Sequence, residues 1–203
     1  RYYAVTGVQT CALPIYRARV EEVVKAAVDT FGSIDVIVNN GQAIVPSAPV
    51  EDTTYENMLA AWQSGTIGSL NYMQAAFPYM KEQHEGRIIN FASATGMFGI
   101  AGQLAYGSNK EALRGLTKIA AKEWGQYGIC VNVVLPGAES PAAKAWAEKF
   151  PEEYQKQVML NPMHRFGDPE DDIAPVVAFL AGPDSCYFSG QSVIVDGANS
   201  IMP

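Results

Sequence analysis

Cysteine and histidine are scarce in this sequence, and they are scattered. Its 203 residues include three cysteines and two histidines. Cys11, Cys130 and Cys186 are odd in number and far apart, which argues against a disulfide framework and against a cysteine-rich metal motif. His84 and His164 are equally isolated, with no cluster of Cys, His or acidic residues at ligand spacing. We therefore expect no metal site, and buried or incidental thiols.

The sequence also lacks an excess of positive charge and long apolar runs. The 14 Lys and Arg residues are outnumbered by 21 Asp and Glu, which gives a net charge of -7 and a pI near 4.8. That balance, with no basic cluster, argues against a nucleic-acid partner. No apolar run is long enough to span a bilayer, and no basic-then-apolar secretory signal opens the chain. We expect a cytoplasmic protein without a membrane partner.

Glycine is absent where a nucleotide-binding fold needs it. After Gly7 the next glycine is Gly32, whereas a phosphate-binding turn needs several glycines close together. Residues 5–15, VTGVQTCALPI, resemble the conceptual translation of a sequencing-library adapter. We therefore interpret residues 1–16 as a non-native segment and residues 17–203 as the functional part, the alternative being a divergent first strand.

From residue 17 onward, helix-like and strand-like segments alternate. Apolar residues at helical spacing predict a helix at 17–31, a long one at 54–80 interrupted by Gly65 and Gly68, and another through 106–124. Shorter helices are expected at 141–150, 151–160 and, after an N-cap at Asp168, 168–182. β-branched runs predict strands at 35–41, 86–93, 129–137 and 191–197, the first of them buried on both faces. With 48% hydrophobic residues, the pattern predicts a single α/β domain with a doubly wound, Rossmann-like parallel sheet.

The segment YGSNK, residues 106–110, carries the most suggestive chemistry. On a helix, Tyr106 and Lys110 lie four residues apart on one face. A cation beside a phenol stabilises the phenolate, so the pair is a candidate proton donor near neutral pH. A surface pair at this spacing also arises by chance, so support must come from elsewhere in the chain.

That support comes from the ends of the predicted strands, where ligands of such sheets bind. Asn39–Gly41 follow one strand, Ser93 ends the next, thirteen residues before Tyr106, and Pro136–Gly137 end the third. A Val-Asp-Gly, Val195 to Gly197, closes the last strand. In this order and spacing the motifs resemble the short-chain dehydrogenase/reductase family over residues 17–199.

The resemblance implies a catalytic Ser-Tyr-Lys site. Tyr106 would be the general acid in carbonyl reduction and the base in alcohol oxidation. Lys110 would lower the pKa of that phenol and bind the nicotinamide ribose, and Ser93 would hold the substrate oxygen. For Ser93 alone, the simpler interpretation is a strand-end hydroxyl that caps backbone groups.

The resemblance also implies NAD or NADP as the cofactor. Asn39 and Gly41 would border its adenosine side, Gly41 because a side chain there would block close approach. Pro136 and Gly137 would shape the nicotinamide pocket, and Ser140 would contact the carboxamide. Strand-terminating turns are the simpler interpretation of the same residues.

We therefore predict an NAD(P)-dependent oxidoreductase that interconverts a small-molecule alcohol and a ketone. Residues 138–165 would form a lid, and a homo-oligomer, dimer or tetramer, is expected. The substrate pocket would have mostly apolar walls, formed by Met97, Phe98, Ile100, Trp146, Phe150, Met159 and Met163. A non-catalytic homologue, or a truncated fragment unable to bind the dinucleotide, is the alternative; a sugar-nucleotide epimerase fits less well, because little chain follows Pro136.

Two departures from the family pattern matter. The family's usual Asn in the helix before the serine strand aligns with Gly65, so a water relay to Lys110 would use water alone, Ser64 or Gln63; on this basis Gly65→Asn is expected not to reduce turnover. The family's first βαβ units do not fit in sixteen residues. We therefore expect a fragment that lacks those units and has an exposed sheet edge.

Overall fold

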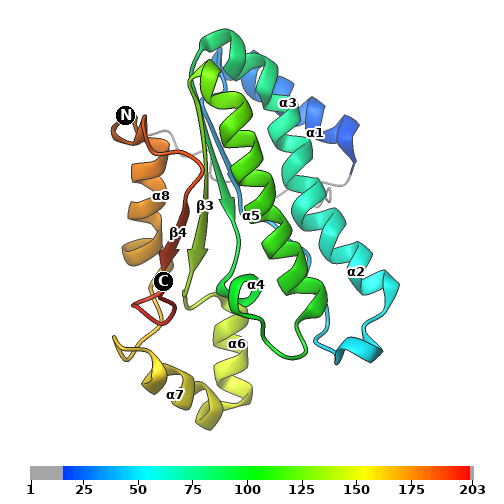
Figure 1. Ribbon diagram of the computed structural model, residues 1–203, viewed down its shortest axis with the longest axis vertical. Coiled ribbons are helices and arrows are strands. Elements are labelled where there is room, and N and C mark those ends of the chain that lie inside the picture. The colour runs from blue at the N-terminus through cyan, green and yellow to red at the C-terminus, as the bar shows by residue number, and fades with distance from the viewer. Residues whose placement is uncertain (1–15, 202–203) are drawn as a thin grey trace.

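The computed structural model describes residues 16–201, except the side chain of Ala142, so nearly all of the N-terminal segment 1–16 lies outside the described residues. Four parallel strands form one sheet in the order β1 (Val36–Asn39), β2 (Gly86–Phe91), β3 (Ile129–Pro136) and β4 (Ser192–Val195) (Figure 1). In their register, Ile37 pairs with Ile88 and Ile88 with Val131. The predicted single α/β domain with a parallel sheet is confirmed.

Helices cover both faces of this sheet. In Figure 1, α1 (Arg17–Phe31), α3 (Gly68–Gln83) and α5 (Leu104–Trp124) lie on one side and α8 (Ala174–Ala181) on the other. Between the first group of helices and the sheet lies a cluster of buried apolar residues, which come from these helices and from three strands. Among them are Val24, Met73, Ile88, Ala120 and Val131. The second is a smaller cluster in which Leu180 of α8 packs with Ile89 and Val134. This two-sided cover is the doubly wound arrangement that the alternating pattern predicts.

Most helix ends follow the signals in the sequence. Gly32 ends α1 in the left-handed conformation, at φ +85°, and Asp168 accepts hydrogen bonds from the Glu170 and Asp171 amides as the N-cap of the π-turn η4 (Pro169–Ile173). The other helices are α2 (Tyr55–Trp62), α4 (Ala94–Phe98), α6 (Pro141–Lys149) and α7 (Pro151–Leu160), with short 3₁₀ turns η1 (Val50–Asp52), η3 (Gly125–Tyr127) and η5 (Pro183–Ser185). Within the described part of the chain, no helix is both long and apolar enough to span a membrane.

The long helix expected at 54–80 is divided. A π-turn, η2 (Gln63–Ile67), separates α2 from α3, and Ser64, Gly65 and Thr66 within it are buried. The glycine interruption therefore takes the form of a widened turn in a continuous helical run. Turns of this kind are frequent at functional sites.

One strand departs from its predicted burial. Residues 35–41 were predicted to be buried on both faces, but Val36 and Val38 of β1 are 37% and 45% exposed. β1 pairs only with β2 among the described residues, and only Ile37 faces the core. The prediction was wrong because a β-branched run reveals strand propensity but not whether a neighbouring layer covers each face.

Buried polar side chains tie β1, β2 and α5 together. Asn39 donates a hydrogen bond to Oδ1 of Asn90 at 2.8 Å, and Asn90 donates to Oγ1 of Thr117 at 2.9 Å. Thr117 donates in turn to the Leu113 carbonyl at 2.9 Å, and both Asn90 and Thr117 are 0% exposed. Because no water reaches these groups, each depends on its neighbour for a partner.

We predict that Thr117→Val lowers the free energy of unfolding by about 1–3 kcal/mol, because the Asn90 amide is left buried without its oxygen partner. Urea unfolding measures the change. Thr30→Val is the matched control, since the Thr30 hydroxyl makes the same bond four residues back, to Ala26, on an exposed surface. Equal effects of the two substitutions would contradict the role of the buried chain.

Candidate active site

The predicted catalytic residues meet at the carboxyl end of β2. Ser93 follows β2 and caps α4, where its Oγ accepts a hydrogen bond from the Thr95 amide at 3.2 Å. Tyr106 and Lys110 lie on the first two turns of α5. The two helices pack closely, since a Cβ built at Gly96 would lie 2.9 Å from the Glu111 nitrogen. This close packing holds Ser93 beside the start of α5.

Tyr106 lies near both of the other side chains, but it interacts with them in different ways. Ser93 and the Tyr106 hydroxyl are hydrogen-bonded. Lys110 is 6% exposed, and its Nζ donates a hydrogen bond to the Phe91 carbonyl at 2.6 Å. That nitrogen lies 5.6 Å from the centroid of the Tyr106 ring. The structure therefore brings the predicted residues together, with Ser93 at the phenol and Lys110 behind the ring.

The electrostatics differ from those the resemblance implies. Burial raises the pKa of Tyr106, and the hydrogen bond from Ser93 only partly opposes that shift. Burial also lowers the pKa of Lys110 to about 8. The ammonium of Lys110 donates to the Phe91 carbonyl, and the net shift of the Tyr106 pKa is upward, so a lowering of the phenol pKa by Lys110 stays a prediction. The amine is instead close to its protonation midpoint near neutral pH, which suits it for exchanging protons.

The predicted cofactor residues at the end of β1 divide into structural and open positions. The Asn39 side chain is engaged with Asn90, so it contributes to the fold. Gly41 is exposed, and a Cβ built there would meet no atom within 4 Å. Beside it, both amide atoms of Gln42 are buried without a hydrogen-bond partner among the described residues. This strand end therefore has open space at Gly41 and, beside it, a buried amide that the fold leaves unpaired.

The residues at the end of β3 have clear structural roles. Pro136 pairs with Val195, and the Gly137 amide donates to the Val195 carbonyl at 2.8 Å. A Cβ at Gly137 would lie 2.6 Å from Cβ of Asp196, so glycine is required here by packing between strand ends. Ser140 caps α6 by accepting a hydrogen bond from the Ala143 amide at 3.2 Å. Contact of these residues with a cofactor stays a prediction.

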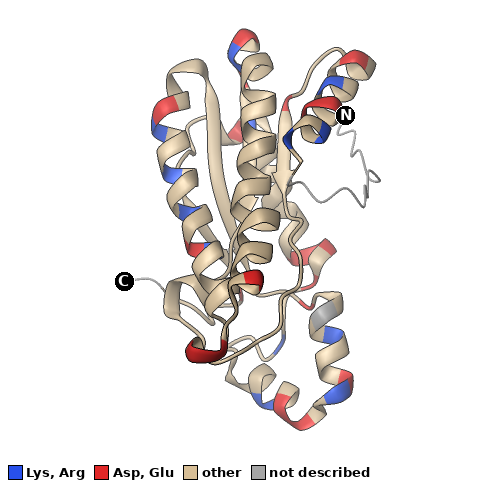
Figure 2. Cartoon of the chain, turned by 90° about the vertical axis from the view of Figure 1, so that its right-hand side faces the viewer, with Lys and Arg blue, Asp and Glu red and all other residues tan. Residues whose placement is uncertain are grey.

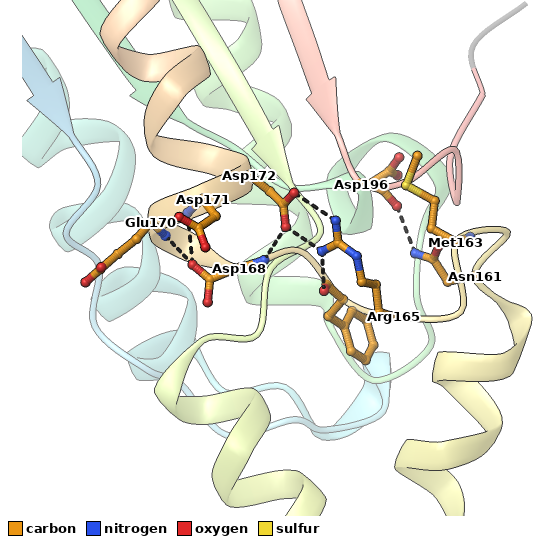
Figure 3. A network of polar contacts seen from close by, with 9 residues as sticks. Asn161, Met163, Arg165, Asp168, Glu170, Asp171, Asp172 and Asp196 are labelled. Carbon is orange, nitrogen blue, oxygen red and sulfur yellow. Dashed lines mark hydrogen bonds and ion pairs between the residues drawn. The ribbon is translucent and has the colours of Figure 1, made fainter.

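The predicted lid, residues 138–165, contains α6 and α7 below the strand ends (Figure 1). Figure 3 shows how its far end is held. Arg165 forms an ion pair with Asp172, whose Oδ2 also accepts a hydrogen bond from the Asp168 amide at 2.7 Å. These bonds hold the pKa of Asp172 at about 2. Nearby, the buried Asn161 side chain donates to the Asp196 carbonyl at 2.9 Å, so the lid is anchored to the end of β4.

The expected apolar pocket walls are mostly on the surface. Several of the residues are more than 40% exposed, namely Phe98, Ile100, Phe150, Met159 and Met163. Met97 alone packs against a core cluster, beside Val133 and Leu135. Exposure of this kind excludes a place in the core for these five residues, and their contact with a substrate stays a prediction.

Charges elsewhere are interspersed rather than gathered. Figure 2 shows acidic and basic residues mixed along the outer helices. On α1, Arg17 pairs with Glu21 and Lys25 with Asp29, each four residues apart. Exposed pairs at this spacing contribute little to stability and carry no site of their own.

Sequence reasoning missed two features of the site. No helix is predicted between Ser93 and Tyr106, but residues 94–98 form α4, whose five residues and internal glycine give little helical signal. Asn109 was passed over, although it is 0% exposed and hydrogen-bonded to Thr66 of η2. The available signal was a second polar residue directly beside Lys110 in the sequence.

Comparisons with known proteins agree with the fold. The model of a family described as enoyl-(acyl carrier protein) reductase matches residues 16–198. A 12α-hydroxysteroid dehydrogenase from Clostridium sp. is 40% identical over 185 residues, which cover 91% of this chain and 71% of that protein. The structure of ElxO with NADP bound superposes with a TM-score of 0.86 at 28% identity, covering 92% of this chain and 75% of the other. NAD+-bound xylitol dehydrogenase gives 0.84 at 30% identity, with coverages of 92% and 76%.

We predict that Lys110 makes the stability of the fold depend on pH. Its pKa is about 8 in the folded chain and ordinarily 10.5, so between these values the unfolded chain binds more protons. The free energy of unfolding should therefore rise with pH from about 8 to 10.5, by at most about 1.4 kcal/mol per pH unit from this group.

Urea unfolding across this pH range tests the prediction by comparing the parent chain with Lys110→Met, which should remove that rise. Lys118→Met, at an exposed position on the same helix, should leave it in place. An unchanged slope in Lys110→Met would show that Lys110 does not titrate in this range.

Proposed function

Because the chain belongs to the short-chain dehydrogenase/reductase family, we propose that it is an NAD(P)-dependent oxidoreductase that interconverts an alcohol and a ketone. One observation carries the proposal: Ser93, Tyr106 and Lys110, from two separate segments, converge at the carboxyl end of β2. A hydroxyl, a phenol and an amine in this order form a short path for a proton. The path starts at a substrate oxygen and leads into the protein.

The roles of the three groups follow from their surroundings. Ser93 is fixed by the Thr95 amide, so its hydroxyl is held in place to share a substrate oxygen with Tyr106. Tyr106 has a raised pKa and stays protonated at neutral pH, which suits a donor to the oxyanion that forms as a carbonyl is reduced. Lys110, with a pKa near 8, replaces that proton. In alcohol oxidation the same steps run in reverse.

The residues at the strand ends fit a dinucleotide. Gly41 presents backbone that no other residue approaches, and the Gln42 amide has donors and an acceptor without partners. Gly41, Gln42 and Lys110 would hold the cofactor, with Asn39 as the support behind them. The bound nicotinamide supplies or accepts the hydride, and the protein orients it and handles the proton.

Substrate class is suggested by the relatives and by the lid. The 12α-hydroxysteroid and xylitol dehydrogenases are named for alcohols that differ greatly in polarity. The exposed apolar residues of α7 and its neighbours, among them Phe150, Met159 and Met163, favour an apolar alcohol or ketone here. A bulky apolar ketone is therefore the first substrate to test.

We also propose self-association through the outer faces of α3 and α5. Ile67, which precedes α3, and Ile119 of α5 are 41% and 61% exposed. Apolar side chains of this size on adjoining helices can be covered by a second copy.

Tyr106→Phe should reduce turnover by ~10²–10⁴-fold, because the proton donor is lost. Binding of the nicotinamide cofactor, measured by its fluorescence, should stay within experimental error of the parent. Both are measured in the protein as encoded by its natural gene. Tyr187→Phe, at a fully exposed position, is the control. A Tyr106→Phe protein with parental turnover would sink the proposed mechanism, and a parent that binds no cofactor would favour the non-catalytic alternative.

A further inference from the structure

Asn109 fills the space above Gly65. A Cβ built on Gly65 would lie 2.2 Å from Nδ2 of Asn109 and 2.7 Å from its Oδ1. Contacts this short are not tolerated, so no side chain fits at position 65 while Asn109 stays in place. For the single substitution Gly65→Asn, the Asn109 amide would have to move, so we expect a loss of turnover unless position 109 is changed as well. An amide already occupies that space, and it comes from the opposite helix.

The orientation of this amide follows from its partners. Oδ1 accepts hydrogen bonds from the Thr66 amide at 2.9 Å and from the Thr66 hydroxyl at 2.7 Å. A backbone N–H can only donate, so the oxygen of Asn109 must face Thr66. Nδ2 is thereby directed at Gly65. The Thr66 hydroxyl also lies 3.0 Å from the Asn109 carbonyl, so η2 and α5 are joined at both ends of this residue.

The donor end of the amide is unused by the fold. Asn109 is 0% exposed, and its Nδ2 has no hydrogen-bond partner among the described residues. Buried donors are nearly always paired, and an unpaired one is costly. The bonds to Thr66 explain the oxygen of Asn109, but they leave its buried donor end without a structural role.

Its place in the chain points to the role. Asn109 directly precedes Lys110, whose amine is held by the Phe91 carbonyl. The neighbouring hydroxyl of Ser64, an alternative relay group, donates to the Ala60 carbonyl at 2.6 Å and accepts from the Ala43 amide at 3.1 Å, so it is already committed. Asn109 thus carries the one unpaired buried amide donor of the η2–α5 contact among the described residues.

We propose that Asn109 is the positioning residue of this site. The resemblance places an amide side chain at position 65, on the η2 side of the η2–α5 contact. In this chain Asn109 supplies the amide from the α5 side, and Gly65 leaves room for it. Its Oδ1 fixes the second turn of α5, and hence Lys110, against η2. Its Nδ2, directed at Gly65, takes the place of the amide that the resemblance assigns to a side chain at position 65. The inference rests on the proposed function and specifies which residue supports proton exchange within it.

An exchange of the two side chains tests this. The parent is compared with Asn109→Ala, Gly65→Asn and the double variant, each in the protein as encoded by its natural gene. Asn109→Ala should lower kcat by ~10- to 100-fold through misplacement of Lys110, with the KM for NAD(P)H changed less than about threefold. The pH dependence of kcat should shift as well. The double variant should recover kcat to within about threefold of the parent.

Thermal unfolding gives a readout that does not depend on activity. Gly65→Asn alone should lower the unfolding temperature because its side chain meets Asn109, whereas the same change in the Asn109→Ala background should raise it. This coupling also shows whether the single variants are folded when assayed.

The inference is overturned if Asn109→Ala keeps the parental kcat and pH profile. It is equally overturned if the double variant unfolds like the parent but has no more activity than Asn109→Ala. Absence of NAD(P)-dependent activity in the parent would instead contradict the proposed function, and the unfolding data would then test the side-chain exchange by itself.

Discussion

The hydrogen bond from Lys110 to the Phe91 carbonyl joins the last residue of β2 to the second turn of α5. It fixes the helix that carries Tyr106 against the strand that delivers Ser93. It also withdraws the amine from solvent, which is the reason for its pKa near 8. Position and proton affinity at this site therefore have the same origin, the burial of a single lysine at a strand end.

Other contacts along α5 keep that helix in register with the sheet. Thr117, two turns after Lys110, meets Asn90 of β2, and Arg114 donates to Ser192 of β4 at 3.1 Å. Both are side-chain contacts between groups that are poor choices for an apolar core. Their value lies in specificity, because a polar pair is satisfied in one register only. A slip of α5 along the sheet would break both contacts and displace Tyr106 from Ser93.

Much of this could be predicted from the sequence. The strand ends were predicted from short apolar runs followed by Asn, Ser or Pro-Gly. The Tyr106–Lys110 pair was predicted from helical spacing. Both signals are local in the sequence. What could not be predicted depends on tertiary packing. Val38 is exposed because no described helix or strand covers that side of β1. The direction of the Lys110 amine depends on the Phe91 carbonyl. Asn109 and Thr66 are 43 residues apart, and neither marks the other in the sequence.

The central claim is that this constellation works on a bound nicotinamide cofactor. The most direct measurement is a fluorescence titration of the protein with NADH and NADPH, followed by addition of a bulky apolar ketone. The account predicts saturable binding of at least one of the two, and oxidation of the bound cofactor only when the ketone is present. No fluorescence change with either cofactor, together with no protection of the fold from thermal unfolding, would contradict it.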